Sequence, residues 1–379
     1  MKILIVAHIG ETLGHLVRGI SIAKELEKRG IEVSFAASDR AISLLKENFN
    51  LHVLSWNFSH NSFEPNNPTS ETLKAILLSN KNLLELLETH RPNLIIGMPG
   101  IFTAQVALKI GIPHLSVMHG PYLSPLIPIK GFTESETKII ESTQQLFVSG
   151  CVDSIRRHLS KSLNLPYSTY QEYLETERIF VPQPNLFIQP ADNIQLVNFI
   201  NASLGEPFRG EERDLREACH ITFGSGSCTD LTKIVHLARQ FFPRLVVSCG
   251  TNKLEKVPDQ VDVQPFISSF SLAGRVRAVI SHGGIGTVGT FAASQTPQLI
   301  IPTDCDQANM TIYTRHTGIA HSVGKSGWEQ TQQLGRCMPQ FTDGELINSL
   351  EKLSFQSETN WKKLSSGASE IAESIVASF

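Results

Sequence analysis

Residues 278–309 read AVISHGGIGTVGTFAASQTPQLIIPTDCDQAN, and this stretch decides the fold. The apolar run 278–281 predicts a short strand, and the glycine-rich turn that follows leads into a helix. The three glycines of this turn, Gly283, Gly284 and Gly286, permit tight backbone bends. Their missing side chains let an anion approach the amides at the helix start.

Polar side chains accompany these glycines at one edge of the predicted sheet. His282 follows the strand, and Thr287 lies in the first turn of the helix. Asp306 and Gln307 follow the next predicted strand, 298–302, so we expect them at the same edge, where open α/β sheets bind ligands. An amide cradle for phosphates, beside a carboxylate and an amide suited to hydroxyls, predicts a sugar-nucleotide site.

The same residues resemble the donor-binding signature of two-domain, B-type glycosyltransferases. The similarity is greatest to UDP-glucuronosyltransferases and to macrolide and glycopeptide antibiotic glycosyltransferases. The family pattern H-x-G-x-x-[ST], a later proline and D-Q-x-x-N is matched in order by His282, Gly284, Thr287, Pro297, Asp306, Gln307 and Asn309. The resemblance implies an α/β fold of two facing, doubly wound Rossmann-like domains (GT-B type) with a cleft between them.

Composition narrows the alternatives. The chain has 379 residues, of which 41% are hydrophobic and 18% charged, and this length and mixture suit two globular domains. The net charge of −3 without a basic block argues against nucleic acid as a partner. Six scattered cysteines predict reduced thiols in a cytoplasmic protein. No apolar run is long enough to span a bilayer. Peripheral membrane contact is left open.

Strands and helices alternate along the whole chain, which predicts two parallel sheets. We expect an N-terminal acceptor-binding domain at 1–205 and a C-terminal nucleotide-sugar-binding domain at 206–357. The proline-rich and then polar stretch 182–217 is the expected linker. Apolar residues at helical spacing predict one long helix over 358–378, and the family implies that the terminal segment, 358–379, packs back on the N-terminal domain.

The loop after the first strand, residues 8–18, carries the sequence HIGETLGHLVR. Gly14 frees the turn, and His15 begins the first predicted helix, where a neutral imidazole is favoured and can accept a proton near pH 7. In the resembling families the catalytic base corresponds to His15. The alternative is a histidine that only caps the helix.

This chain departs from many relatives beside that histidine. Arg18 stands where they often have proline, either near the cleft to help hold a diphosphate or exposed on the helix. The resulting G-H-x-x-R resembles nucleotide-sugar hydrolases and the transferase that adds N-acetylglucosamine to the peptidoglycan lipid precursor. Relatives orient the base with an aspartate after a mid-domain strand, but residues 94–100 hold no acid, so either the helper is absent or Glu11 substitutes. His119 is expected to be structural, and the alternative is that it reaches the acceptor pocket.

Further donor contacts follow from the resemblance. Ser225 lies in an F-G-S element that meets the donor diphosphate. Phe266 stands where the family flanks the nucleobase, and a core phenylalanine fits its sequence equally well. Thr290 replaces a glutamate that often chelates the ribose hydroxyls, which leaves UDP- and dTDP-sugars both open. The predicted donor-binding residues are Gly14, Ser225, Phe266, His282, Gly283, Gly284, Gly286, Thr287, Asp306 and Gln307.

These patterns predict an inverting glycosyltransferase that needs neither a metal nor a cofactor besides its nucleotide-sugar substrate. His15 would deprotonate a hydroxyl of a small, partly apolar or lipid-linked acceptor. Two long proline-rich loops, 56–69 and 121–132, would shape the acceptor pocket. Two alternatives stay open: a nucleotide-sugar hydrolase or epimerase on the same fold, and a non-catalytic partner of another glycosyltransferase.

Overall fold

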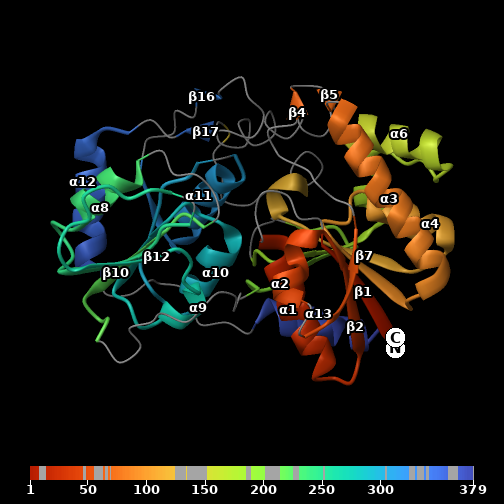
Figure 1. Ribbon diagram of the computed structural model, residues 1–379, viewed down its shortest axis with the longest axis horizontal. Helices are drawn as coiled ribbons and strands as arrows, with labels where there is room; N and C mark the ends of the chain where they lie inside the picture. The colour runs from red at the N-terminus through yellow and green to blue at the C-terminus, as the bar shows by residue number, and fades with distance from the viewer. Residues whose placement is uncertain are drawn as a thin grey trace.

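The computed structural model describes residues 1–7, 14–45, 48–54, 63–64, 67–68, 70–123, 134, 152–184, 189–200, 214–224, 230–250, 252–303, 305–323, 329–330, 337–338, 341–356 and 366–378. Its core is formed by two separate parallel sheets, each covered by helices (Figure 1). We call the sheet of seven strands with its helices the first domain, and the sheet of six strands with its helices the second domain.

The first sheet has the order β3-β2-β1-β6-β7-β8-β9, and every pairing in it is parallel. Its strands are β1 (Lys2–Ala7), β2 (Glu32–Ala37), β3 (Asn50–Val53), β6 (Leu94–Met98), β7 (His114–Val117), β8 (Arg178–Val181) and β9 (Ile194–Leu196). The helices of this domain are α1 (Gly14–Glu27), α2 (Ile42–Leu45), α3 (Ser70–His90), α4 (Thr103–Ile110), α6 (Asp153–Leu163) and α7 (Tyr170–Thr176), with short 3-10 turns at Asp39–Ala41 and Gly120–Leu123. The short strands β4 (Phe63–Glu64) and β5 (Asn67–Pro68) pair in antiparallel orientation.

The second sheet has the order β12-β11-β10-β13-β14-β15 and is also parallel throughout. Its strands are β10 (Ala218–Thr222), β11 (Arg244–Ser248), β12 (Val261–Gln264), β13 (Ala278–Ser281), β14 (Gln298–Ile300) and β15 (His321–Ser322). The helices are α8 (Leu231–Ala238), α9 (Ser269–Leu272), α10 (Ile285–Ala293), α11 (Cys305–Thr317) and α12 (Asp343–Phe355), and β16 (Glu329–Gln330) pairs with β17 (Cys337–Met338).

Both sheets reverse their winding direction at one point. In the first sheet the chain runs outward from β1 to β3 and then returns to add β6 on the other side of β1. In the second sheet it runs outward from β10 to β12 and returns to add β13 beside β10. The carboxyl ends of strands at such a switch point diverge into loops that leave room for a ligand. This fold therefore has two places suited to bind a ligand: one at the loops after β1 and β6, and one at the loops after β10 and β13.

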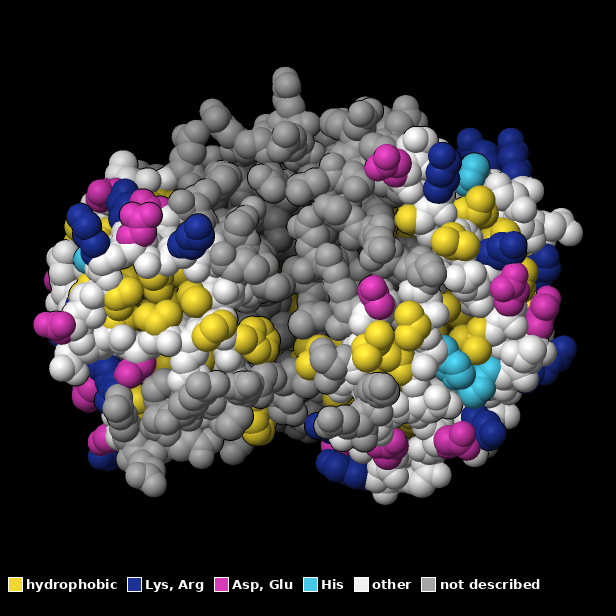
Figure 2. All heavy atoms as spheres, in the orientation of Figure 1, with side chains coloured by type: hydrophobic (Ala, Val, Ile, Leu, Met, Phe, Trp, Pro, Cys, Tyr) yellow, Lys and Arg dark blue, Asp and Glu magenta, His cyan; other side chains and the backbone are white. Residues whose placement is uncertain are grey.

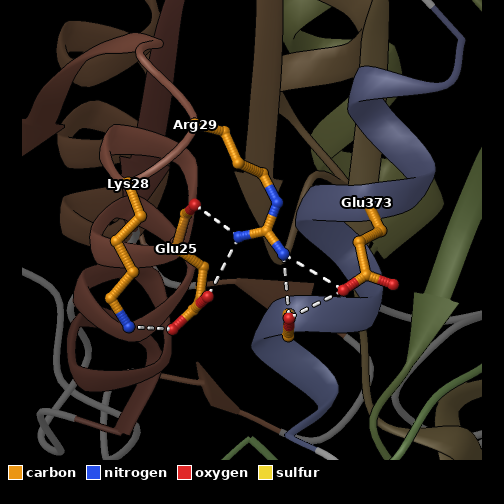
Figure 3. Close-up of polar contacts among 5 residues, drawn as sticks. Glu25, Lys28, Arg29 and Glu373 are labelled. Carbon is orange, nitrogen blue, oxygen red and sulfur yellow. Dashed lines mark hydrogen bonds and ion pairs between the residues drawn. The ribbon is translucent and has the colours of Figure 1, made fainter.

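A last helix, α13 (Gly367–Val376), belongs to the first domain although it ends the chain. Its apolar side chains Ala368, Ile371, Ala372 and Ile375 are buried in the same core as those of α1. At the rim of this contact Arg29 donates hydrogen bonds of 3.0 Å to Ser369 and 3.1 Å to Glu373, and it also contacts Glu25 (Figure 3). The prediction of one continuous helix over 358–378 is wrong, because Ser366 is extended (φ −76°, ψ 127°) and the helix begins after it.

The segment that follows β9 joins the two domains. Phe199 packs in an apolar cluster with side chains of α10 and α11, and a β-carbon on Gly289 in α10 would lie 2.5 Å from that of Phe199. The Phe199 carbonyl accepts a hydrogen bond of 3.1 Å from Gly367, at the start of α13. The predicted linker over 182–217 is therefore wrong in part, because it contains β9 and this packing segment. The predicted boundaries near 205 and 357 lie outside the described residues.

Candidate active site

Three loops meet at the carboxyl edge of the second sheet, around His282. A β-carbon on Gly224, after β10, would lie 3.1 Å from Cε1 of His282, and one on Gly284 would lie 2.8 Å from its Nε2. A β-carbon on Gly283 would lie 3.5 Å from the Gln307 carbonyl oxygen in α11. The imidazole is thus enclosed between two glycines at the switch point, and side chains at either position would displace it.

His282 is a neutral hydrogen-bonding group. Burial lowers its pKa to about 4, and the carbonyl of Thr222 only partly offsets this effect. Its Nδ1 atom is buried and has no hydrogen bond of normal geometry within the described part of the chain. A neutral ring with one N–H can donate to a phosphate oxygen without placing a second buried charge at the site.

Helix α10 presents its first turn beside this ring. Gly284 is its N-cap and forms no side-chain capping bond, and Gly283 before it has a φ of +89°. Gly286 and Thr287 in the first turn are partly exposed. Amides of an uncapped first turn and the positive end of the helix dipole attract an anion. The structure therefore brings His282 together with Gly283, Gly284, Gly286 and Thr287, which is the grouping that the sequence predicts.

The Asp-Gln pair begins α11. The Gln307 side-chain oxygen accepts hydrogen bonds of 2.7 Å from the Thr303 amide and 2.9 Å from the Thr303 hydroxyl. Gln307, which the sequence predicts to bind sugar hydroxyls, therefore also binds the segment that precedes α11 through this oxygen. Nothing is described of the side chain of Asp306. Ser225 lies outside the described residues.

Phe266, predicted beside the nucleobase, and Thr290, predicted beside the ribose, differ in how exposed their side chains are. Phe266, just after β12, is 43% exposed, so it is not a core phenylalanine. In Figure 2 hydrophobic side chains gather on the lobe of the second domain between β12 and α10. Thr290 is 2% exposed, and its hydroxyl donates a 2.8 Å hydrogen bond to the Gly286 carbonyl. Thr290 therefore cannot replace a ribose-chelating glutamate, because its hydroxyl is used inside the helix.

On the first domain His15 lies at the start of α1, next to Gly14, as the sequence predicts. The same guanidinium nitrogen of Arg18 lies 2.8 Å from His15 Nδ1 and 3.0 Å from His119 Nε2. The two imidazole rings meet edge to face, with centroids 5.9 Å apart. Arg18 is 4% exposed, which excludes the exposed-helix alternative. These three residues form a polar cluster at the switch point of the first sheet.

His119 is the residue of this cluster whose contact with Arg18 the sequence did not predict. It follows β7, 101 positions from Arg18, and nothing local in the sequence pairs the two. Burial, and then the charge of Arg18, hold its pKa well below the usual range. The neighbouring Gly120 donates a 2.6 Å hydrogen bond to Gln183, whose own amide faces Met310 in α11 at 3.9 Å. The prolines on either side of Gln183 predicted a linker there. Gln183 instead connects the loop after β7 to the second domain through Gly120 and Met310.

The His15 cluster on α1 and the His282 site beside α10 are close to each other, because α1 packs against α10.

Glu11 and most of the loops predicted to bind an acceptor lie outside the described residues. Within the described residues, no group of three His, Cys, Asp or Glu side chains could hold a metal ion. In the same part of the chain, no helix combines the length and the hydropathy that crossing a bilayer requires.

Acidification is expected to destabilise the fold through its buried histidines. The pKa values of His220, in β10, and of His282 are each lowered to about 4 by burial. The unfolded chain, with pKa near 6.5, binds more protons, so stability is complete above pH 6.5 and falls as the pH drops toward 4. At pH 5 the expected loss is about 2 kcal/mol per histidine. Urea unfolding at pH 7.5 and pH 5 measures it.

The variants His220→Asn and His282→Asn provide the control for this prediction. Each removes one titrating ring, so each should reduce the difference in stability between the two pH values by about 2 kcal/mol. An unchanged difference in both variants would show that other groups cause the acid sensitivity.

Comparison with known proteins agrees with this architecture. No protein-family model matches the sequence. Over 192 residues the chain is 22% identical to a Bacillus subtilis (strain 168) protein described as the uncharacterized UDP-glucosyltransferase YojK. That match spans 50% of this chain and only 39% of the relative.

Solved structures cover the whole chain. The glycosyltransferase of kitacinnamycin superposes with a TM-score of 0.69 at 16% identity, covering 99% of this chain and 98% of its own. The glycosyltransferase VinC, solved in complex with dTDP, gives a TM-score of 0.61 at 15% identity and covers 100% and 94%. This chain therefore has the fold of the two-domain, B-type glycosyltransferases. The fold resemblance that the sequence predicted is confirmed.

Proposed function

We propose that this protein transfers a sugar from a nucleoside-diphosphate sugar to an acceptor oxygen, with inversion at the anomeric carbon and without a metal. The observation that carries the proposal is the neutral His282 enclosed by Gly224 and Gly284 at the uncapped start of α10. Few ligands other than a phosphate or diphosphate match an imidazole N–H beside helix-terminal amides at a switch point.

The donor site supplies the chemistry at the leaving group. As the bond from the anomeric carbon to the diphosphate breaks, negative charge grows on the oxygen that leaves. Amides of residues 284–287, His282 and the helix dipole stabilise that charge where it develops. The Gln307 amide and Asp306 hold sugar hydroxyls and orient the anomeric carbon. Phe266 lies against the nucleobase, and the buried Thr290 leaves the choice between uridine and thymidine diphosphates to other groups.

The acceptor meets His15 on the first domain. Attack from the face opposite the diphosphate inverts the anomeric carbon. A hydroxyl acceptor, small, partly apolar or lipid-linked, must lose its proton during this attack, and His15 is the group assigned to take it.

The buried position of Arg18 beside His15 also favours a second candidate, a nucleotide-sugar hydrolase or epimerase, because the G-H-x-x-R sequence resembles that of those enzymes. The free thiols of Cys219 and Cys249 support the proposal of a reducing, cytoplasmic compartment.

A thermal-shift titration with dTDP, UDP and GDP tests the donor site. We expect one or more of these nucleotides to stabilise the protein by about 2.7 kcal/mol at a hundred times its Kd. The His282→Asn variant should lose this stabilisation, because it removes the ring beside the amides. His220→Asn is the matched control, since burial lowers the pKa of His220 to the same value of about 4, but His220 lies within β10, away from the loops.

The two candidate reactions differ in what they require. Nucleotide release from a dTDP- or UDP-sugar in the absence of any acceptor, abolished in a His15→Ala variant, would favour the hydrolase. A protein that no nucleotide stabilises would contradict the donor site itself and leave the non-catalytic partner as the better explanation.

A further inference from the structure

Gln183 lies between the two halves of the candidate active site. It follows β8, and its backbone amide donates a 2.8 Å hydrogen bond to the carbonyl of Val181, the last residue of that strand. Its side chain is 1% exposed. It accepts a 2.6 Å hydrogen bond from the Gly120 amide in the first domain, and it faces the Met310 sulfur of α11, in the second domain, at 3.9 Å. This buried side chain therefore joins the loop after β7 to α11.

The chemistry of its two partners fixes how the Gln183 amide is turned. A backbone N–H only donates, so the side-chain oxygen must face Gly120. The NH₂ group then points to Met310, whose sulfur is a weak acceptor. Glutamine meets both demands with one uncharged side chain. A methionine of the same length offers neither polar atom, and an ionised carboxylate offers no donor for the sulfur.

Each end of this bridge leads to residues assigned to the reaction. In the first domain it ends at the residue after His119, and His119 lies 3.0 Å from the Arg18 nitrogen that also contacts His15. In the second domain it ends at Met310, one helical turn after Gln307 and on the same side of α11. A chain of direct contacts therefore runs from the proposed base to the helix that carries the proposed sugar-binding pair.

A second polar contact at the same boundary offers a comparison. Tyr313, one turn after Met310 in α11, donates a 2.5 Å hydrogen bond to the carbonyl of Pro184. Tyr313 and Met310 also pack in one apolar cluster with Met118 and Val181 of the first domain. The helix α11 is thus held at two neighbouring positions, 183 and 184. In the described part of the chain, position 183 is the one bonded to the loop after β7.

We propose that Gln183 is a positioning residue of the sugar transfer, and that it sets the distance between His15 and the sugar held at the start of α11. The inference rests on the proposed function. The base must reach the acceptor while the acceptor oxygen faces the anomeric carbon, and the base and the sugar site belong to different domains. A displacement of about 1 Å between such groups slows a reaction by about 10²-fold. Gln183 transmits the position of α11 to the loop after β7 and, through His119 and Arg18, to His15.

Steady-state kinetics test the proposal with two variants of Gln183. Gln183→Met keeps the length of the side chain without its polar atoms, and Gln183→Asn keeps the amide but is one methylene too short to span both contacts. Nucleotide release is followed from dTDP-glucose or UDP-glucose, whichever nucleotide gives the larger thermal shift, with water and with 2-naphthol as acceptors. We expect kcat to fall at least tenfold in both variants. The KM for the sugar donor and the Kd of its nucleotide should change less than twofold, because the donor site lies within the second domain.

Tyr313→Phe provides the control, because it removes the neighbouring hydrogen bond across the same boundary and leaves the Gly120 contact in place. Its kcat should stay within twofold of the wild-type value. Hydrogen exchange of the segment 117–123 identifies the cause of any difference. Exchange of the Gly120 amide should be faster in Gln183→Met and unchanged in Tyr313→Phe, because only Gln183→Met loses the acceptor of that amide. If Gln183→Met fails to fold, Gln183→Asn carries both measurements.

Two results would overturn the proposal and leave the donor function standing. One is an unchanged kcat in the Gln183 variants. The other is an equal fall of kcat in Tyr313→Phe, which would mean that any weakening of the boundary between the domains slows the reaction. A protein that no nucleotide stabilises, or that releases no nucleotide even when the enzyme is in excess over the sugar donor, fails earlier, at the proposed function itself.

Discussion

A Gly367→Ala variant is expected to lose about 3–5 kcal/mol of its free energy of unfolding. A β-carbon at this position would lie 1.8 Å from the carbonyl oxygen of Asn198 and 2.8 Å from its carbonyl carbon. Both atoms belong to the backbone, so no side chain can rotate to make room. Either α13 withdraws from α1 or the segment after β9 moves away from α10, and each movement exposes buried apolar surface.

Urea unfolding measures this loss, with Gly344→Ala as the control. Gly344 lies in the first turn of α12, and the nearest atom to its added β-carbon is the Thr342 hydroxyl at 3.9 Å. Alanine there should be neutral or stabilise by up to about 1 kcal/mol, because it favours the helix and meets no obstacle. Equal stabilities of the two variants would mean that the contact of Gly367 with Asn198 does not hold the domains together.

A Gly283→Ala variant is expected to lose at least tenfold in nucleotide affinity and about 2–3 kcal/mol in stability. The φ of Gly283 is +89°, which alanine adopts only with strain. Its β-carbon would also lie 2.6 Å from Cγ2 of Ile300, at the end of β14. Relief of that contact turns the peptide before α10, and with it the amides proposed to hold the diphosphate.

Gly318→Ala separates backbone strain from this contact. Gly318 has a φ of +69° and no atom within 4 Å of an added β-carbon. It should show only the strain, about 1–2 kcal/mol, with unchanged nucleotide affinity. Isothermal titration with the nucleotide and urea unfolding give the two quantities. If Gly283→Ala bound the nucleotide as tightly as Gly318→Ala, the amides of α10 would not form the phosphate site.

Much of the fold could be predicted because parallel strands buried on both faces appear as short apolar runs. The strand predicted at 278–281 is observed with the same ends, as β13, and the one predicted at 298–302 is observed over 298–300, as β14. The sequence also placed His282 and the glycines at one sheet edge. That inference needs only the order of strand, turn and helix, which is a local property of the chain.

Other parts depend on contacts between distant positions. β9 is a three-residue edge strand surrounded by prolines, so its local sequence resembles a linker, and only pairing with β8 makes it a strand. Arg18 and His119 come together because β1, β6 and β7 are neighbours in the sheet. No spacing rule within one segment contains these facts.

The docking of α13 on α1 has a consequence for biosynthesis. Four side chains near the end of the chain, Ala368, Ile371, Ala372 and Ile375, complete the core that begins with Ile3 in β1. Domains generally fold as units, N-terminal first, while the ribosome is still adding residues. Here the first domain to be synthesised is the last to be finished, because its core stays open until Ile375 emerges. The second domain can close its own sheet earlier, so the order of completion is the reverse of the order of synthesis.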